Sequence, residues 1–262
     1  MFIYNINPVL LNLGPIQIRY YGLVYVIGFL VIYFALKYYS NKGILKLTKQ
    51  EVESFALYLM LGVLIGARLF VVFGWSFLLG DPLYYIRDPL KIIAVWEGGM
   101  SLHGGIVGIL LVGYFFCKKK KLNIAKVADL LSIPGAFVLA LGRIANFING
   151  EIVGTITNLP WCFKFPKFEG CRHPVQLYSA AGRVLLGGYL LLINSKKYKN
   201  GFIFWIFITL MGIGRFFCDF VREDPRFLGL SFGQYLSIVM IIAGIVVLIR
   251  YYKKDLNIKK LI

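Results

Sequence analysis

Long apolar segments alternate with short polar ones along this chain. Two runs without a charged residue, 200–214 and 227–249, approach or exceed the ~20 residues that an α-helix needs to cross a hydrocarbon core about 30 Å thick. Further apolar segments of similar length carry only a few charges. We therefore expect seven transmembrane helices, over residues 20–39, 52–74, 99–117, 127–149, 174–194, 201–221 and 231–250.

The composition supports a membrane protein rather than a soluble one. Of the 262 residues 59% are hydrophobic and the mean hydropathy is +0.74, whereas a soluble domain contains about 45–50% apolar residues. No removable signal peptide is evident, because the first apolar segment follows a neutral stretch and lacks a small-residue cleavage site. The expected fold class is all-α, a polytopic membrane protein in which residues 1–262 form a single membrane-embedded domain.

The basic residues indicate how the helices are oriented. A net charge of +17 would suggest a nucleic-acid partner for a soluble protein, but here the lysines gather in short loops between apolar segments. If alternate loops lie on one side, that side holds about twice as many Lys and Arg as the other, which places the N-terminus outside and the C-terminus in the cytoplasm. No nucleic-acid partner is expected. The two longest connections, 75–98 and 150–173, then lie on the outer face.

Four arginines fall within the predicted spans: Arg68, Arg143, Arg183 and Arg215. Each would cost ~2.5–3.5 kcal/mol if it faced lipid at the centre of the bilayer. We therefore expect all four to face the helix bundle, water or the headgroup region.

Polar residues recur on one face near the outer end of the fourth helix. Arg143, Asn146 and Gly150 are spaced i, i+3, i+7, and Glu151 follows directly. This spacing predicts one polar face that ends at the membrane surface.

A second charged face lies near the outer end of the sixth helix, where Arg215, Asp219 and Arg222 are spaced i, i+4, i+7. A structural reading is an ion-pair ladder in which Asp219 is held between the two arginines. A functional reading is a site for an anion, and the sequence leaves both open.

His103 lies between glycines at the outer entrance of the third helix, within Gly98–Gly105. Glycines on both sides would let a substrate or a neighbouring backbone approach this titratable side chain closely. A single histidine at a membrane interface is also commonly only hydrogen-bonded there, and the same holds for His173, which precedes the proline that is expected to start the fifth helix.

The polar candidates converge on one side of the membrane. Eight of them map to the outer ends of different segments: Tyr21, His103, Arg143, Asn146, Glu151, Arg172, Arg215 and Arg222. Unrelated structural residues would scatter over both faces. The convergence favours a pocket at the outer leaflet that binds an anionic phosphate beside a base.

The cysteines show no metal-binding spacing, so neither a metal nor a cofactor is expected. Cys162 and Cys171 share one loop and could pair if that loop faces an oxidising compartment. The sequence leaves their redox state open.

The segment Gly142–Gly154, with the residues Gly-Arg-Ile-Ala-Asn-Phe-Ile-Asn-Gly-Glu-Ile-Val-Gly, resembles the signature of the prolipoprotein diacylglyceryl transferase family. Further blocks that resemble this family are Trp96–Gly105, Tyr21–Leu23, Arg172–Tyr178 and Gly214–Arg222. The resemblance implies an enzyme of the bacterial cytoplasmic membrane whose active site faces the outer leaflet. It would move the diacylglyceryl group of phosphatidylglycerol, among the membrane lipids around it, onto the lipobox cysteine of a preprolipoprotein, forming a thioether and releasing glycerol phosphate.

The resemblance also implies roles for individual residues. It assigns His103, Arg143 and Arg215 to positions important for catalysis. The residues expected around phosphatidylglycerol are Tyr21, Arg143, Asn146, Glu151, Gly154, Arg215, Asp219 and Arg222.

Four positions depart from the family pattern. Ala145 stands where glycine is usual, and Asp219 and Ser179 stand where glutamate is common. Met211 replaces a frequent tyrosine four residues before Arg215, which removes a hydroxyl from that helix face.

A transporter or flippase for an anionic phospholipid is the alternative function. It would also bury arginines, and it predicts functional charges on a path to the cytoplasmic side. Asp129, near the inner end of the fourth helix, fits such a path, although an acid at a helix start more simply acts as a cap.

Overall fold

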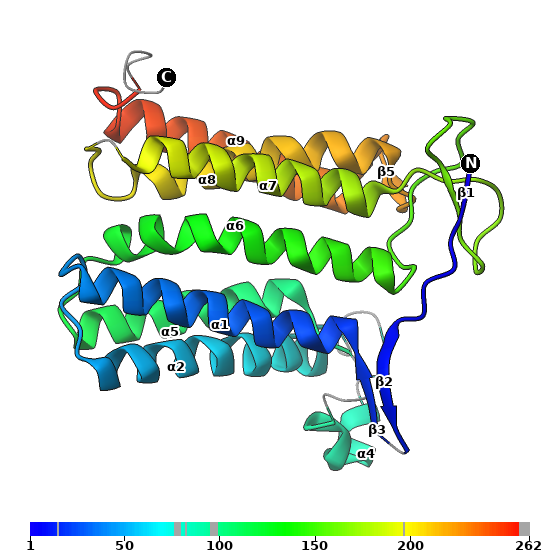
Figure 1. Cartoon of the computed structure of the whole chain (residues 1–262), viewed down its shortest axis with the longest axis horizontal. Coiled ribbons are helices and arrows are strands. Elements are labelled where there is room, and N and C mark those ends of the chain that lie inside the picture. Colours follow the sequence, from blue (N-terminus) through cyan, green and yellow to red (C-terminus); the bar gives the residue numbers. More distant parts are fainter. Residues whose placement is uncertain (15, 76–79, 82, 95–98, 196, 257–262) are drawn as a thin grey trace. The chain divides into compact units, whose positions relative to one another are not determined.

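The computed structural model describes residues 1–262 except 15, 76–79, 82, 95–98, 196 and 257–262. Within these residues, seven helices are long and apolar enough to cross a membrane (Figure 1). They are α1 Tyr20–Asn41, α2 Lys49–Leu69, α5 Leu102–Lys119, α6 Ile124–Ile148, α7 Val175–Asn194, α8 Phe202–Cys218 and α9 Phe232–Tyr251. The predicted fold class, an all-α polytopic membrane protein with seven spanning helices, is confirmed.

Short elements connect these helices. The strands are β1 Phe2–Ile3, β2 Val9–Leu13, β3 Ile16–Arg19, β4 Phe163–Lys164, β5 Arg226–Phe227 and β6 Leu230–Ser231. The short helices are η1 Phe70–Trp75, α4 Tyr84–Arg87, η2 Pro89–Ile92 and η4 Asp219–Val221. β1 pairs in parallel with β4, whereas β2–β3 and β5–β6 are antiparallel hairpins.

The N-terminal ends of two helices are fixed by capping boxes. Thr48 accepts a hydrogen bond from the Glu51 amide at 3.3 Å, and the Glu51 carboxylate accepts one from the Thr48 amide at 2.8 Å. This polar first turn makes α2 begin at residue 49, three residues before the apolar pattern predicted. Ser231 and Gln234 form the equivalent box at the start of α9.

Asp129 caps a neighbouring helix. Its carboxylate accepts hydrogen bonds from the Gly201 amide at 2.5 Å and from the Phe204 amide at 2.7 Å, at the start of α8. These amides are donors that a helix start leaves without intrahelical partners. The contacts give Asp129 a structural task that needs no transport path.

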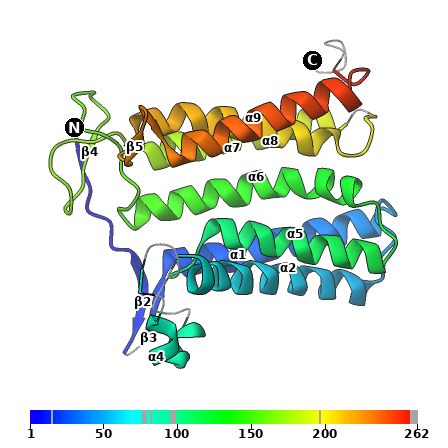
Figure 2. The same cartoon turned by 180° about the vertical axis from the view of Figure 1, so that it is seen from behind.

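The chain divides into two compact units, one of residues 1–31 and 128–262 and the other of residues 32–127. The expectation of a single membrane-embedded domain remains a prediction. In the first unit, α7, α8 and α9 lie side by side, as both views show (Figures 1 and 2).

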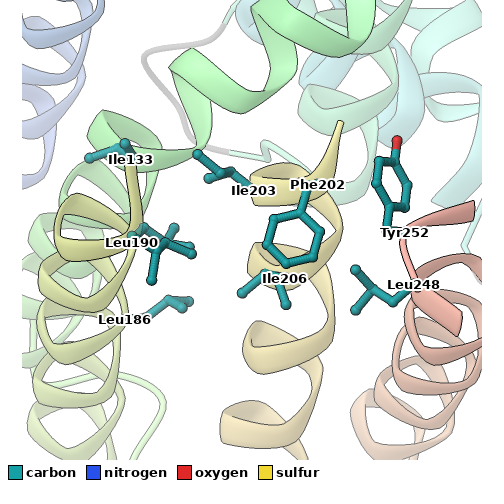
Figure 3. Packing of buried hydrophobic residues seen from close by; sticks show 9 residues of the cluster. Ile133, Leu186, Leu190, Phe202, Ile203, Ile206, Leu248 and Tyr252 are labelled. Carbon is teal, nitrogen blue, oxygen red and sulfur yellow. The ribbon is translucent and has the colours of Figure 1, made fainter. Parts of the chain in front are cut away.

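An apolar cluster holds one end of the first unit together (Figure 3). Leu190 of α7 and Phe202 of α8 are fully buried, and Leu248 of α9 packs with them. The Tyr252 hydroxyl closes this end by donating to the Asn200 carbonyl at 2.9 Å. The cluster leaves the opposite ends of the same helices for polar side chains.

In the second unit, α2 and α5 touch through glycine backbones. A Cβ atom added at Gly104 would overlap the Gly66 carbonyl, and one added at Gly108 would overlap the Gly62 carbonyl. Both helices therefore carry glycines four residues apart on their shared face, the arrangement that lets membrane helices approach closely. Helix packing therefore explains why Gly104, the residue after His103, has no side chain.

Arg68 is one of the four arginines expected to avoid lipid, and it ties down a loop of the second unit. It is 6% exposed. Its guanidinium donates to the carbonyls of Ile92 at 3.1 Å and Gly99 at 2.9 Å, and to that of Lys91. The Arg68 guanidinium thus acts as a hydrogen-bond donor to the backbone carbonyls of this loop.

Candidate active site

A polar pocket lies in the first unit, at the helix ends opposite the apolar cluster. It is formed by the end of α6, the first turns of α7 and the end of α8. Its lining residues are Arg143, Ile152, Val175, Gln176, Ser179, Arg183, Arg215, Asp219 and Arg222. Four guanidiniums thus meet in one pocket.

Asp219 is shared by two of these arginines. Its carboxylate lies 3.4 Å from Arg215 Nε and 3.9 Å from an Arg222 terminal nitrogen, and its side chain is only 5% exposed. A Cβ atom at Gly233 would overlap Asp219 and crowd Arg215, so the absence of a side chain there makes room for the pair. The ion-pair ladder, one of the two readings that the sequence left open, is present in the structure.

Arg143 heads a second chain of polar contacts. It donates to Asn146 Oδ1 at 3.3 Å, and Asn146 Nδ2 donates to the Glu151 carboxylate at 2.7 Å. α6 can place Glu151 there because Gly150 adopts φ +63°, a conformation that ends helices and suits glycine. The predicted polar face is therefore a connected network.

The connection 150–173 contributes Ile152 to the pocket lining, and backbone pairing holds the connection in place. The Gly154 amide donates to the His173 carbonyl at 3.1 Å, and the Thr155 amide donates to the Val221 carbonyl at 2.9 Å. Arg172 donates to the Gly154 carbonyl at 3.1 Å and also pairs with Glu223. The connection is thus attached to the segment that follows α8.

Position 154 in this connection has no room for a side chain. A Cβ atom there would overlap the Cβ and carbonyl of His173. Gly154 therefore permits a close backbone approach, and its assignment to phosphatidylglycerol binding remains a prediction. Burial lowers the pKa of His173, and its Nδ1 lies 3.3 Å from the Tyr178 hydroxyl.

Cys162 and Cys171 form a disulfide in the same connection. The bond closes the loop that carries β4, one residue before Arg172. The question that the sequence left open is answered in favour of pairing.

Tyr21 and His103 differ in how they relate to the pocket. Tyr21, in the first turn of α1, lies close enough to Arg143 to interact with it electrostatically. His103 belongs to the second unit, in the first turn of α5, with its ring centre 6.3 Å from that of Phe70. Its role beside the arginines therefore remains a prediction. Residues 96–98 of the motif around it lie outside the described residues.

Gln176 and Arg183 are pocket residues that the sequence did not assign. They share one face of α7 with Ser179, at i, i+3, i+7, and this spacing was the available signal. For Arg183 the sequence indicates only that its charge must avoid lipid. Met211 packs against the apolar cluster, so the position of the missing hydroxyl belongs to the core.

The pocket carries more positive than negative charge. Its lining holds four arginines and one carboxylate, Asp219, and Asp224 lies 3.0 Å from Arg222 just outside it. Burial is the main cause that raises the pKa of Asp224. Guanidinium groups stay charged in proteins and form paired hydrogen bonds with phosphate oxygens. The arrangement is suited to an anion.

Among the described residues, no group of three or more His, Cys, Asp or Glu could hold a metal ion. The expectation that no metal or cofactor takes part remains a prediction.

Seven spanning helices define a multi-pass membrane protein, and the arginine pocket at the ends of α6, α7 and α8 has the chemistry of a site for an anion. Residues 8–250 match the prolipoprotein diacylglyceryl transferase family, and the chain belongs to that family. It is therefore a transferase of lipoprotein biosynthesis, as the resemblance implied.

Relatives from several bacteria support this assignment over almost the whole chain. The phosphatidylglycerol–prolipoprotein diacylglyceryl transferase of Geobacter sulfurreducens is 39% identical over 251 residues, which cover 92% of this chain and 94% of the relative. That of Bordetella parapertussis is 40% identical, with 92% and 93% covered. That of Wolbachia pipientis is 36% identical, with 93% and 94% covered.

Proposed function

We propose that this chain transfers the diacylglyceryl group of phosphatidylglycerol to the lipobox cysteine of preprolipoproteins. The cysteine thiolate attacks the glycerol carbon that carries the phosphate ester, a carbon–sulfur bond forms, and the carbon–oxygen bond breaks. Glycerol phosphate leaves with the electron pair, and a base takes the thiol proton. The observation that carries the proposal is the four-arginine pocket in a chain of this family.

Arg143 and Arg215 bind the phosphate in this proposal. Negative charge grows on the departing oxygens as the phosphate diester becomes a monoester. Fixed donors stabilise such charge strongly where little water is present, and they need no rearrangement during the reaction. Asn146 orients Arg143, and Asp219 orients Arg215 and Arg222.

The glycerol headgroup is placed beside Glu151 and Gln176. Gln176 is 1% exposed, and its Nε2 donates to the Glu151 carbonyl at 2.6 Å. Its Oε1 has no hydrogen-bond partner within the described part of the chain. A buried acceptor beside several donors suits a ligand that has both anionic oxygens and a hydroxyl, as a phosphoglycerol headgroup does.

His103 accepts the thiol proton, directly or through water, in this mechanism. A free cysteine, with a reference pKa near 8.5, is mostly protonated at neutral pH, so a neighbouring base accelerates attack. Histidine is suited to this task near neutral pH.

The enzyme lies in the bacterial cytoplasmic membrane with its N-terminus and the arginine pocket towards the outer leaflet. The charge bias of the loops supports this orientation. The Cys162–Cys171 disulfide supports it independently, because disulfides persist outside the cytoplasm and are rare within it.

A direct assay tests the function. The purified protein is incubated with phosphatidylglycerol labelled in its acyl chains and a peptide that contains a lipobox cysteine. We expect label on the peptide cysteine, and a Cys→Ser peptide is the control. Label that stays in lipid, or only changes leaflet, would instead support a flippase and overturn the proposal.

A further inference from the structure

We propose that Arg183 is a further phosphate-binding arginine beside Arg143 and Arg215, which contacts the anionic oxygens of the phosphoglycerol headgroup and of the glycerol phosphate product. This inference rests on the proposed function. It adds a substrate-contacting residue on α7, a helix to which the sequence assigned none.

The hydrogen bonds of Arg183 are incomplete. The side chain is 8% exposed, and one terminal nitrogen donates to the Ser179 carbonyl at 2.7 Å. Its Nε is buried and has no hydrogen-bond partner among the residues that the structure describes. A guanidinium offers five N–H donors, and leaving them unused in a buried position is unfavourable. The unused donors lie on a side chain that lines the pocket.

The charge of Arg183 is also unbalanced. The guanidiniums of Arg143 and Arg215 repel it, and Asp219 is the carboxylate that attracts it. That carboxylate is already shared by Arg215 and Arg222. In the described residues no acid lies within ion-pair distance of Arg183, so an anion bound in the pocket would pair with a charge that the chain leaves without a close partner.

Arg68 shows what a structural buried arginine looks like in this chain. It is buried to a similar degree, and it donates to the carbonyls of Lys91, Ile92 and Gly99. Arg183 has one such carbonyl. The contrast favours a ligand-binding task for Arg183 over a purely structural one.

The chemistry of the reaction determines what Arg183 does. The phosphate diester of the lipid has two unesterified oxygens and one negative charge, whereas the monoester product has three such oxygens and a second charge. An additional guanidinium therefore stabilises the departing phosphate more than the bound lipid, and its loss lowers kcat more than it raises KM.

The test compares Arg183→Gln and Arg183→Lys with Arg226→Gln, a matched charge removal outside the pocket. Arg226 is exposed and donates to the carbonyls of Phe220 and Gly229. Three quantities are measured in detergent micelles: transfer to the lipobox peptide, inhibition by glycerol phosphate and by inorganic phosphate, and the thermal midpoint of unfolding. The midpoint reports folding separately from activity.

We expect Arg183→Gln to lower kcat about 10- to 100-fold and to weaken glycerol phosphate inhibition at least about tenfold, consistent with a lost charge-assisted hydrogen bond. Arg183→Lys should retain part of the transfer activity and part of the inhibition by glycerol phosphate. It replaces Arg183→Gln in the test if the latter does not fold. Arg226→Gln should stay within about twofold of the wild type.

Two results would overturn the inference. One is a folded Arg183 variant whose kcat and inhibition match those of Arg226→Gln. The other is an effect confined to inorganic phosphate, with transfer and glycerol phosphate inhibition unchanged, which would indicate a free-phosphate site. Failure of the proposed function is distinct, because the wild type itself would then leave the peptide unlabelled.

Discussion

Asp219 controls how two of the pocket arginines are oriented. We expect Asp219→Asn to lower transfer more than about tenfold, because Arg215 and Arg222 lose the carboxylate that holds them together and repel each other. Asp219→Glu, which keeps the charge, should retain much more activity. The initial rate of peptide lipidation measures both. Equal losses in the two variants would show that packing at this position matters and charge does not.

The proposed role of His103 predicts how the rate of transfer depends on pH. If it is the general base, transfer by the wild type should fall at acidic pH, because a protonated imidazole cannot accept the thiol proton. His103→Gln should lower kcat about 100-fold or more and remove this acidic limb. A pH–rate profile with a peptide of fixed concentration measures the effect. Near-normal transfer by the variant across the pH range would contradict the base assignment.

The sequence predicted much of the pocket because helical spacing places residues on shared faces. Arg143 with Asn146, and Arg215 with Asp219, follow from spacing alone and are in contact. The place of Arg183 in the pocket was harder to predict. A single charge in an apolar helix must avoid lipid, but this does not identify its neighbours. Gln176 was harder still, since an uncharged amide gives no such signal.

At the scale of elements, the glycine contact between α2 and α5 predicts a strong effect of a small change. Gly108→Ala should destabilise the protein by about 1–3 kcal/mol, because the added methyl group meets the Gly62 backbone and the helices must separate. Thermal unfolding in detergent measures the loss.

The same helix supplies the control for this substitution. Gly113→Ala adds an identical methyl group where no atom lies within 4 Å. We expect it to be neutral or slightly stabilising, since alanine favours helices by about 1 kcal/mol over glycine. Similar losses at both positions would contradict close backbone packing as the cause.

The sequence predicted the seven helices well because each must be long and apolar to cross a bilayer. Helix starts were less predictable where polar capping residues extend the helix beyond its apolar part, as at Thr48. The two-residue strands β1 and β4 could not be foreseen. Their pairing depends on backbone contacts between distant segments, and two residues show no periodicity.

At the scale of the whole molecule, the disulfide should contribute to stability. Replacing Cys162 and Cys171 together by serine should lower the free energy of unfolding by about 2–3 kcal/mol, because the unfolded chain gains the freedom of a short open loop. Chemical denaturation measures the change. A reductant should destabilise the wild type by a similar amount and leave the double variant unaffected. A reductant effect on the double variant would point to another cause.

The same cysteines test the orientation in the membrane. After mild reduction of cells with a permeable outer envelope, a membrane-impermeant maleimide should label Cys162 and Cys171 from outside. Cys117, which is buried in α5, should not be labelled whether or not the inner membrane is opened. Labelling of Cys162 and Cys171 only after that step would reverse the proposed topology.

The pairing of β1 with β4 has a consequence for biosynthesis. Phe2 leaves the ribosome about 160 residues before its partner Phe163. At about 5–20 residues per second, translation takes roughly 8–30 s to produce that partner. The amino-terminal strand therefore waits while four helices are inserted by the translocation machinery. The strand β1 is thus made before these helices but paired only after them.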